Sequence, residues 1–109
     1  MMELRHYTSP SGKDVFESWL MSLTDDRAEA RIDARINRLS QGNFGDCKPV
    51  GSGVWELRID YGPGYRVYYA MVGQRCVLLL CGGDKRKQSS DIAKAIEYLK
   101  DYKQRSKSQ

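Results

Sequence analysis

Two arginines on either side of a tight turn have the residue type and the spacing to bind a phosphate group. Arg58 and Arg66 flank the sequence YGPG, where proline fixes φ and glycine allows positive φ, so the chain is expected to reverse direction there. A hairpin that pairs positions 60 and 64 places the two arginines directly opposite each other on one face. Like charges so placed repel, and a chain that keeps them together usually binds an anion, for which the guanidinium fork suits phosphate.

Neighbouring residues extend this hypothesis and also offer a structural alternative to it. Tyr68 lies next to Arg66 on the same predicted face, where it provides a hydroxyl group or a stacking surface. The strand before the turn carries Glu56 and Asp60, and these acids are sufficient to neutralise the arginines without any ligand. Both interpretations follow from the sequence.

A second group of cations follows the most apolar segment of the chain. The sequence CVLLLC, residues 76–81, leads into two glycines and then into Lys85, Arg86 and Lys87. An antiparallel meander brings strand ends together, and free backbone N–H groups at a helix start add positive potential. We therefore predict a phosphate-binding groove formed by this cluster and the two arginines.

Composition indicates one soluble domain with a basic second half. The chain has 109 residues, with 29% charged and 40% hydrophobic residues and a net charge of +4. Residues 1–53 carry seven Lys/Arg against eight Asp/Glu, whereas residues 54–109 carry eleven against six. This asymmetry points to a polyanionic partner or to a helical tail that is basic for solubility. No apolar run is long enough to span a membrane, and the N-terminus lacks the apolar core of a signal peptide.

Metal and redox sites are not expected. Cys47, Cys76 and Cys81 are odd in number and have no CxxC spacing, and His6 is the only histidine. The cysteines are expected to be small buried hydrophobes in a reduced, cytoplasmic setting, and His6 is expected to be structural. No cofactor is predicted.

The first half predicts a strand and two helices. Residues 2–7 form a strand candidate, and Ser11 with Asp14 resembles a capping box before an amphipathic helix over residues 12–22. Thr24 is the predicted N-cap of a second helix that Gly42 closes, and the short connection favours an antiparallel helical hairpin.

The second predicted helix carries a row of arginines about one turn apart. These are Arg27, Arg31, Arg35 and Arg38. Glu29 and Asp33 are interleaved with them, so we interpret the row as a solvated face with local ion pairs.

The second half predicts three strands and a helix. Residues 43–53 have the composition of a loop, residues 54–60 alternate as a half-buried strand, and residues 65–72 alternate again. Residues 76–81 are apolar throughout, so they should form a central strand covered on both faces. Ser89 or Ser90 is expected to cap the last helix, whose polar tail, residues 103–109, should fray.

These elements give an α+β fold in the order β-α-α-β-β-β-α, with a small, mostly antiparallel sheet, an N-terminal helical hairpin and a C-terminal helix. The whole chain, residues 1–109, is expected to form a single domain. One core is predicted to bury a set of apolar residues from all of these elements: Trp19, Leu57, Val67, Leu79 and Ile96.

The segment VWELRIDYGPGYRVYYAMVGQRCVLLLCGGDKRKQSSDI, with the helices before it, resembles the RelE/ParE superfamily of toxin–antitoxin toxins. The similarity is greatest to the addiction-module killer proteins related to the HigB toxins, through the signatures E-L-R, Y-R-V-Y-Y and GG-D-K-x-x-Q. It covers Leu4 to about Tyr102. The resemblance implies a RelE-like fold and a bacterial gene pair whose antitoxin, often a helix-turn-helix protein, neutralises this chain.

The resemblance also implies an activity, which is metal-free cleavage of mRNA, commonly on the ribosome. Arg58 and Arg66 match the family's strand-borne basic residues, and Lys85 or Arg86 matches the one near the end of the last strand. Three residues, Arg58, Arg66 and Arg86, would stabilise the phosphate in the transition state. Lys85, Lys87 or Tyr68 would act as acid or base, because clustered cations lower a lysine or tyrosine pKa. The predicted RNA-binding residues are Arg58, Arg66, Lys85, Arg86 and Lys87.

Some family residues have no match here, and this leaves alternatives open. Ile92 or a neighbour stands where the RelE branch uses a catalytic tyrosine, and Glu56 stands where that branch has a lysine. The ParE branch inhibits DNA gyrase and lacks the ribonuclease residues, so a gyrase inhibitor is the second hypothesis. A non-catalytic RNA-binding module is the third.

Overall fold

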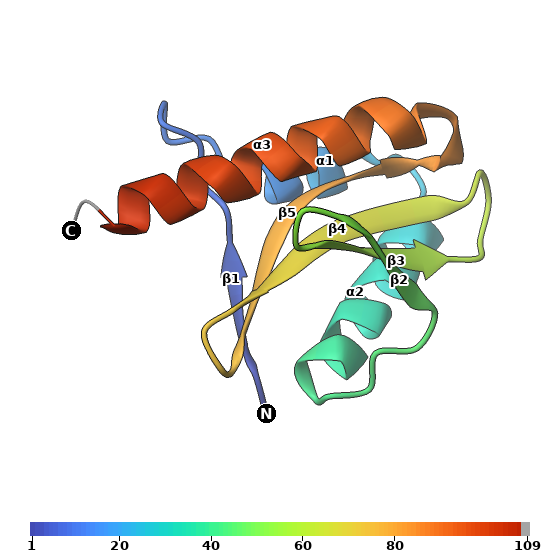
Figure 1. The fold of residues 1–109 in the computed structure, drawn as a ribbon. Helices are drawn as coiled ribbons and strands as arrows, with labels where there is room; N and C mark the ends of the chain where they lie inside the picture. The colour runs from blue at the N-terminus through green and yellow to red at the C-terminus, as the bar shows by residue number, and fades with distance from the viewer. Residues whose placement is uncertain (108–109) are drawn as a thin grey trace.

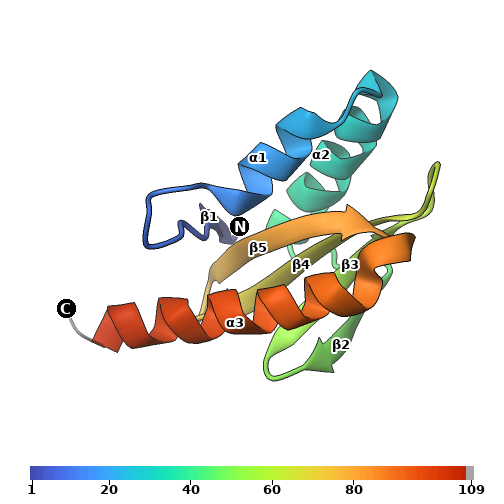
Figure 2. The same cartoon turned by 90° about the horizontal axis from the view of Figure 1, so that it is seen from above.

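A five-stranded sheet lies between a pair of N-terminal helices and a long C-terminal helix in the computed structural model, which describes residues 1–107 (Figures 1 and 2). The strands are β1 (Glu3–His6), β2 (Cys47–Gly51), β3 (Val54–Ile59), β4 (Tyr65–Val72) and β5 (Cys76–Asp84). The helices are α1 (Val15–Ser22), α2 (Asp26–Ser40) and α3 (Gln88–Lys107), and a short 3-10 helix, Lys85–Lys87, links β5 to α3.

The strands are ordered β1-β5-β4-β3-β2, with β1 parallel to β5 and all other neighbours antiparallel. This confirms the predicted α+β class and the three-stranded meander with one extra strand. The meander has a further strand at its edge, however, because Cys47–Gly51 pairs with β3 where a loop was expected. Pro49 concealed this strand from sequence reasoning, but proline is tolerated on an edge because the missing N–H is not needed by a second neighbour.

Two hydrophobic cores, one on each face of the sheet, replace the single core that was predicted. The first lies under α1 and α2 and contains Leu57, Val67 and Leu79, with Trp19 packed against it. The second lies under α3, and Ile96 packs against that core instead. Alternate residues of a strand point to opposite faces, so a sheet covered on both sides necessarily separates such a set.

Aspartates, rather than the predicted serines and threonine, cap the helices. The Asp14 carboxylate accepts a hydrogen bond from the Glu17 N–H at the start of α1, in place of the capping box that begins at Ser11. Asp25, not Thr24, caps α2. Asp84 accepts from the Arg86 N–H and starts the 3-10 helix ahead of α3, so neither Ser89 nor Ser90 is the cap. In each case the cap is an aspartate that lies near the predicted residue in the sequence. Its carboxylate accepts hydrogen bonds from free N–H groups of the first turn.

The two glycines after the apolar run are required by close packing on both faces of β5. A Cβ atom on Gly82 would lie 2.2 Å from Cε3 of Trp19, and one on Gly83 would lie 1.9 Å from Oδ2 of Asp91. The indole from α1 and the carboxyl group from α3 therefore lie directly against the backbone of this strand. Any larger side chain would have to displace them.

The last helix is longer than expected and carries the chain away from the sheet (Figure 1). It continues to Lys107, whereas the sequence favoured a frayed tail from residue 103; residues 108–109 lie outside the described part of the chain. Among residues 1–107, no helix combines the length and apolar character needed to cross a membrane.

Candidate functional site

A pocket of about 450 Å³ opens at the end of the β3–β4 hairpin. Its lining combines three cations, two carboxylates and the turn itself: Arg58, Arg66, Lys85, Asp46, Asp60, Gly62, Pro63 and Gly64. The turn tightens through positive-φ positions on both sides of Pro63, which only glycine adopts without strain. The sharp reversal brings the ends of β3, β4 and β5 together around one open volume.

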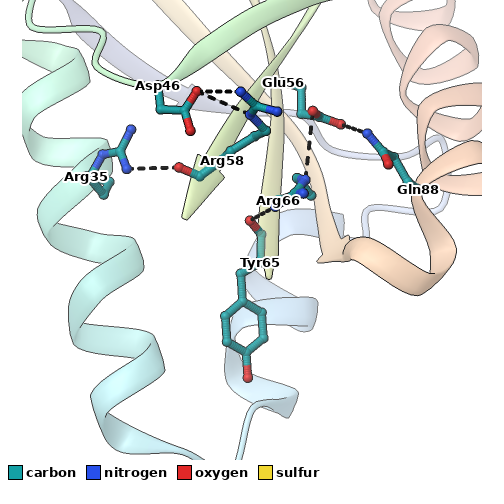
Figure 3. A network of polar contacts seen from close by, with 7 residues as sticks. All are labelled: Arg35, Asp46, Glu56, Arg58, Tyr65, Arg66 and Gln88. Carbon is teal, nitrogen blue, oxygen red and sulfur yellow. Dashed lines mark hydrogen bonds and ion pairs between the residues drawn. The ribbon is translucent and has the colours of Figure 1, made fainter. Parts of the chain in front are cut away.

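Arg58 and Arg66 are directly opposite each other in the β3–β4 register, as the turn sequence predicted. Arg58 donates from Nε and Nη2 to Oδ1 of Asp46, over 3.2 and 2.9 Å (Figure 3). This hydrogen bond and the Asp46 charge raise the pKa of Arg58, so its guanidinium remains a cation. Its side chain is 39% exposed, and it faces solvent at the pocket.

The Arg66 guanidinium forms an ion pair with the buried carboxylate of Glu56. Glu56 is fully buried, and its Oε1 lies 3.8 Å from Nε of Arg66, while Gln88 at the start of α3 donates to its Oε2 over 2.7 Å (Figure 3). Nη1 of Arg66 also donates to the Tyr65 carbonyl. Only 11% of the Arg66 side chain is exposed, so its guanidinium is fixed in place. The prediction of a half-buried β3 with Glu56 on an open face is wrong, because α3 covers that face.

Of the three residues in the predicted lysine–arginine cluster, Lys85 lines the pocket, whereas Arg86 and Lys87 do not. Lys85 lines it, because its backbone N–H donates to the Gly64 carbonyl over 2.9 Å and ties the 3-10 helix to the hairpin turn. Arg86 is not among the lining residues; it is 80% exposed and bonded to Asp84 through Nε and Nη2. Lys87 is exposed and likewise does not line the pocket.

Tyr68 lies outside the pocket, in the core under α3. Its side chain is fully buried, and no hydrogen bond of normal geometry joins its hydroxyl to another group within residues 1–107. Burial and the nearby Glu56 carboxylate raise the pKa of Tyr68 well above its ordinary value. A phenol that is neutral and sealed from solvent is poorly suited to exchange a proton with an RNA substrate.

Two carboxylates of the pocket were not identified from the sequence as site residues. Asp46 precedes β2, in the segment that was expected to be a loop, and Asp60 was considered only as a partner for the arginines. The pocket thus has three cations against two carboxylates, with the buried Glu56 behind Arg66. Asp60 is exposed and makes no ion pair within residues 1–107.

Other chemical groups are located elsewhere or do not cluster. His6 lies on β1, where its Nδ1 is 2.7 Å from Oδ2 of Asp14, and it does not reach the pocket. Within the described chain, no three His, Cys, Asp or Glu residues come together to hold a metal ion. Cys76 and Cys81 are buried free thiols, and burial raises the pKa of both.

Comparisons with known proteins place the chain in a family. The family described as phage-derived protein Gp49-like (DUF891) matches residues 18–102, a range that includes every residue lining the pocket. An uncharacterised protein of Haemophilus influenzae is 56% identical over 81 residues, which make up 74% of this chain and 82% of that relative. The chain therefore belongs to the Gp49-like family of phage-derived proteins.

Proposed function

We propose that this protein is the toxin of a type II toxin–antitoxin module in the RelE/ParE superfamily, and that it cleaves mRNA without a metal ion. Membership of the Gp49-like family is consistent with a toxin-like module. The observation that carries the proposal is the directly opposed pair of Arg58 and Arg66 in one pocket with Lys85. Three converging cations form a natural site for the phosphate of an RNA strand.

The reaction is attack of an RNA 2′-hydroxyl on the adjacent phosphorus. The new bond joins the 2′-oxygen to phosphorus, the bond from phosphorus to the 5′-oxygen breaks, and a 2′,3′-cyclic phosphate is left. Arg66 supports the charge on the phosphate oxygens, since its guanidinium is held in advance by Glu56 and the Tyr65 carbonyl. Arg58 supports the same oxygens from the opposite strand.

Proton transfers are assigned to groups that line the pocket. Asp46 is engaged by Arg58, so Asp60 is the carboxylate available to accept the proton from the 2′-hydroxyl. The Lys85 ammonium group donates a proton to the departing 5′-oxygen. Both groups are exposed, as required for direct contact with a bound strand. Arg86, Lys87 and Tyr68 receive no catalytic role in this scheme.

The test removes Arg66 and measures growth inhibition and mRNA cleavage. Loss of one preorganised charged donor costs about 3 kcal/mol of transition-state stabilisation, or about a hundredfold in rate. Arg66→Ala alone would leave the Glu56 carboxylate buried without a cation, so its fold must be checked by circular dichroism. The variant Arg66→Ala with Glu56→Gln removes both charges and should fold, yet should remain inactive.

Further variants separate a site effect from a general loss of charge. Arg58→Ala should weaken activity less than loss of Arg66, because Arg66 and Lys85 still face the phosphate. Lys85→Ala removes the proposed proton donor, which an arginine does not replace, so it should lower the rate by about a hundredfold or more. Arg75→Ala, in the turn at the opposite end of the sheet, should leave activity unchanged. If the folded double variant at Arg66 and Glu56 still inhibits growth and cuts mRNA, the pocket is not the active site.

A gyrase-directed toxin is the competing outcome of the same assays. Double-strand DNA breaks that accumulate while mRNA stays intact would replace the ribonuclease with a gyrase inhibitor. RNA binding without fragments would leave a non-catalytic module. For both the ribonuclease and the gyrase inhibitor, the proposed partner is a cognate antitoxin made in the same cytoplasm. The non-catalytic module would need no such partner.

A further inference from the structure

The arginine row on α2 occupies one side of that helix, apart from the acids. At about 100° per residue, four side chains fall within an arc of about 80°: Arg27, Arg31, Arg35 and Arg38. Glu29 and Asp33 lie on the opposite flank of the apolar seam that packs on the sheet. The helix thus separates its positive and negative charges, although the sequence interleaves them.

The predicted ion pairs along this row do not form. Within residues 1–107, no carboxylate makes an ion pair with any of the four arginines. Arg35 instead donates from Nη1 to the Arg58 carbonyl over 2.9 Å (Figure 3), and Arg31 lies over the Tyr61 ring at 4.6 Å from its centroid. Both contacts turn the row toward the end of the sheet that holds the pocket. The face is solvated as predicted, since Arg27, Arg31 and Arg38 are exposed, but the predicted local ion pairs are absent from residues 1–107.

A second, smaller hollow follows this row and shares one lining residue, Asp60, with the pocket. It has a volume of about 270 Å³, and its lining is Arg31, Ala34, Arg35, Arg38, Ile59 and Asp60. Asp60 also lines the first pocket, and the hydrogen bond from Arg35 to Arg58 connects the two walls. Three guanidinium groups against one carboxylate give the second hollow a net positive charge.

We propose that this α2 groove binds the phosphates of the RNA strand that flank the one held between Arg58 and Arg66. The inference rests on the proposed function and extends it from one phosphate to a path. Arg31 and Arg38 are exposed and lie about 10 Å apart along the helix at 1.5 Å per residue. Guanidinium groups spaced along one side of the helix, with no ion pair to a carboxylate among residues 1–107, suit phosphates of one backbone and read no base.

Tyr61 lies beside Arg31, one of the residues that line the groove. Its ring is covered by Arg31 on one face, and its hydroxyl donates to the Asp25 carboxylate over 2.9 Å. The ring and the guanidinium plane are therefore fixed at the edge of the groove. Such a pair offers a flat surface on which an unpaired base can stack.

The test compares two RNA lengths and two matched pairs of substitutions. The probes are fluorescent, 2′-O-methylated oligonucleotides that cannot be cleaved: one long enough only for the pocket, and one extended by several nucleotides on both sides. Binding is measured by anisotropy over a range of salt concentrations. Arg31→Ala with Arg38→Ala removes two exposed cations from α2, and Lys100→Ala with Lys103→Ala removes two exposed cations from α3 as the control.

The expected result is a change confined to the long probe. Loss of two phosphate contacts should lower the log–log salt slope by about 1.4, at about 0.7 for each contact on a single strand. The short probe and the α3 control should keep wild-type slopes, and Arg31→Lys with Arg38→Lys should restore most of the slope.

Other results would overturn the inference in distinguishable ways. An unchanged slope for the long probe would show that the strand does not follow α2. Additional binding of the long probe to protein already saturated with the short one would mean that a separate RNA molecule occupies the groove. If the wild-type protein binds neither probe, the proposed RNA-cleaving function is contradicted, and so is the inference that rests on it.

Discussion

At the scale of single residues, the properties of the pocket depend on which charged side chains are buried and which are exposed to solvent. Arg66 forms an ion pair with Glu56 at 3.8 Å, and Glu56 accepts a hydrogen bond from Gln88, so the pocket cation Arg66 is linked to the first residue of α3. A buried carboxylate at such a position is destabilising unless it is paired. Removal of either partner alone is therefore expected to disturb folding, which is why the two substitutions must be combined.

Asp91 gives a prediction about pH. Its side chain is buried against Gly83, Oδ2 has no hydrogen-bond partner within residues 1–107, and burial raises the pKa of the carboxyl group above 3.8. Lys94 and Lys87 oppose this rise in pKa, and Asp84 adds to it, but burial is the larger effect. The folded state therefore holds this proton more tightly than the unfolded state, and stability falls as pH rises from 3.8 through the raised pKa.

Asp91→Asn removes this titration with little change in shape. The variant should be more stable than wild type near about pH 7, and the difference should shrink as pH falls toward about 4. Urea unfolding at the two pH values measures it, with Asp33→Asn on the exposed face of α2 as the control. A difference that is independent of pH would show that Asp91 is not charged at a cost in the folded protein.

At the scale of elements, the turn and the glycines decide how closely the layers approach. Trp19 from α1 lies on Gly82, so Gly82→Ala must displace the indole or the strand. Overpacking of this kind costs about 1–3 kcal/mol. Thermal or urea unfolding should show the loss, and Trp19→Leu in the same chain should recover part of it by making room. Gly42→Ala is the comparison variant. A Cβ there meets no neighbour within 4 Å but φ is +88°, so its loss of stability measures backbone strain without steric overlap.

The elements also differ in how far their positions could be predicted from sequence. YGPG fixes the reversal of the chain, and the reversal fixes the register, so the opposition of Arg58 and Arg66 follows from the sequence pattern alone. The edge strand Cys47–Gly51 could not be predicted, because its residues have little strand propensity and its pairing with β3 alone makes it a strand. Burial of Glu56 was equally hidden, since it depends on where α3 lies.

At the scale of the whole molecule, charge is arranged differently in space than along the chain. The two halves of the sequence differ by a basic excess in the second half, yet α2, from the first half, contributes the cations next to the pocket. Folding brings Arg31 and Arg38 to the same end of the sheet as Arg58 and Lys85. Sequence reasoning brought Arg58, Arg66 and Lys85 together at that end and identified the arginine row of the second helix, but it did not place that row beside the pocket, because the position of α2 on the sheet depends on tertiary packing.

This charged end leads to a prediction about the partner. We expect a cognate antitoxin to cover the pocket with an acidic and apolar segment, because complementary charge speeds association and the same surface must be closed to RNA. Co-expression with the neighbouring small open reading frame, followed by affinity purification, should yield a complex whose association rate falls as salt increases. Arg58→Ala with Lys85→Ala should weaken that complex, whereas Arg75→Ala at the far end of the sheet should not. A chain that purifies alone from such cells, and that does not harm a host lacking the neighbouring gene, would contradict both the partner and the toxin assignment.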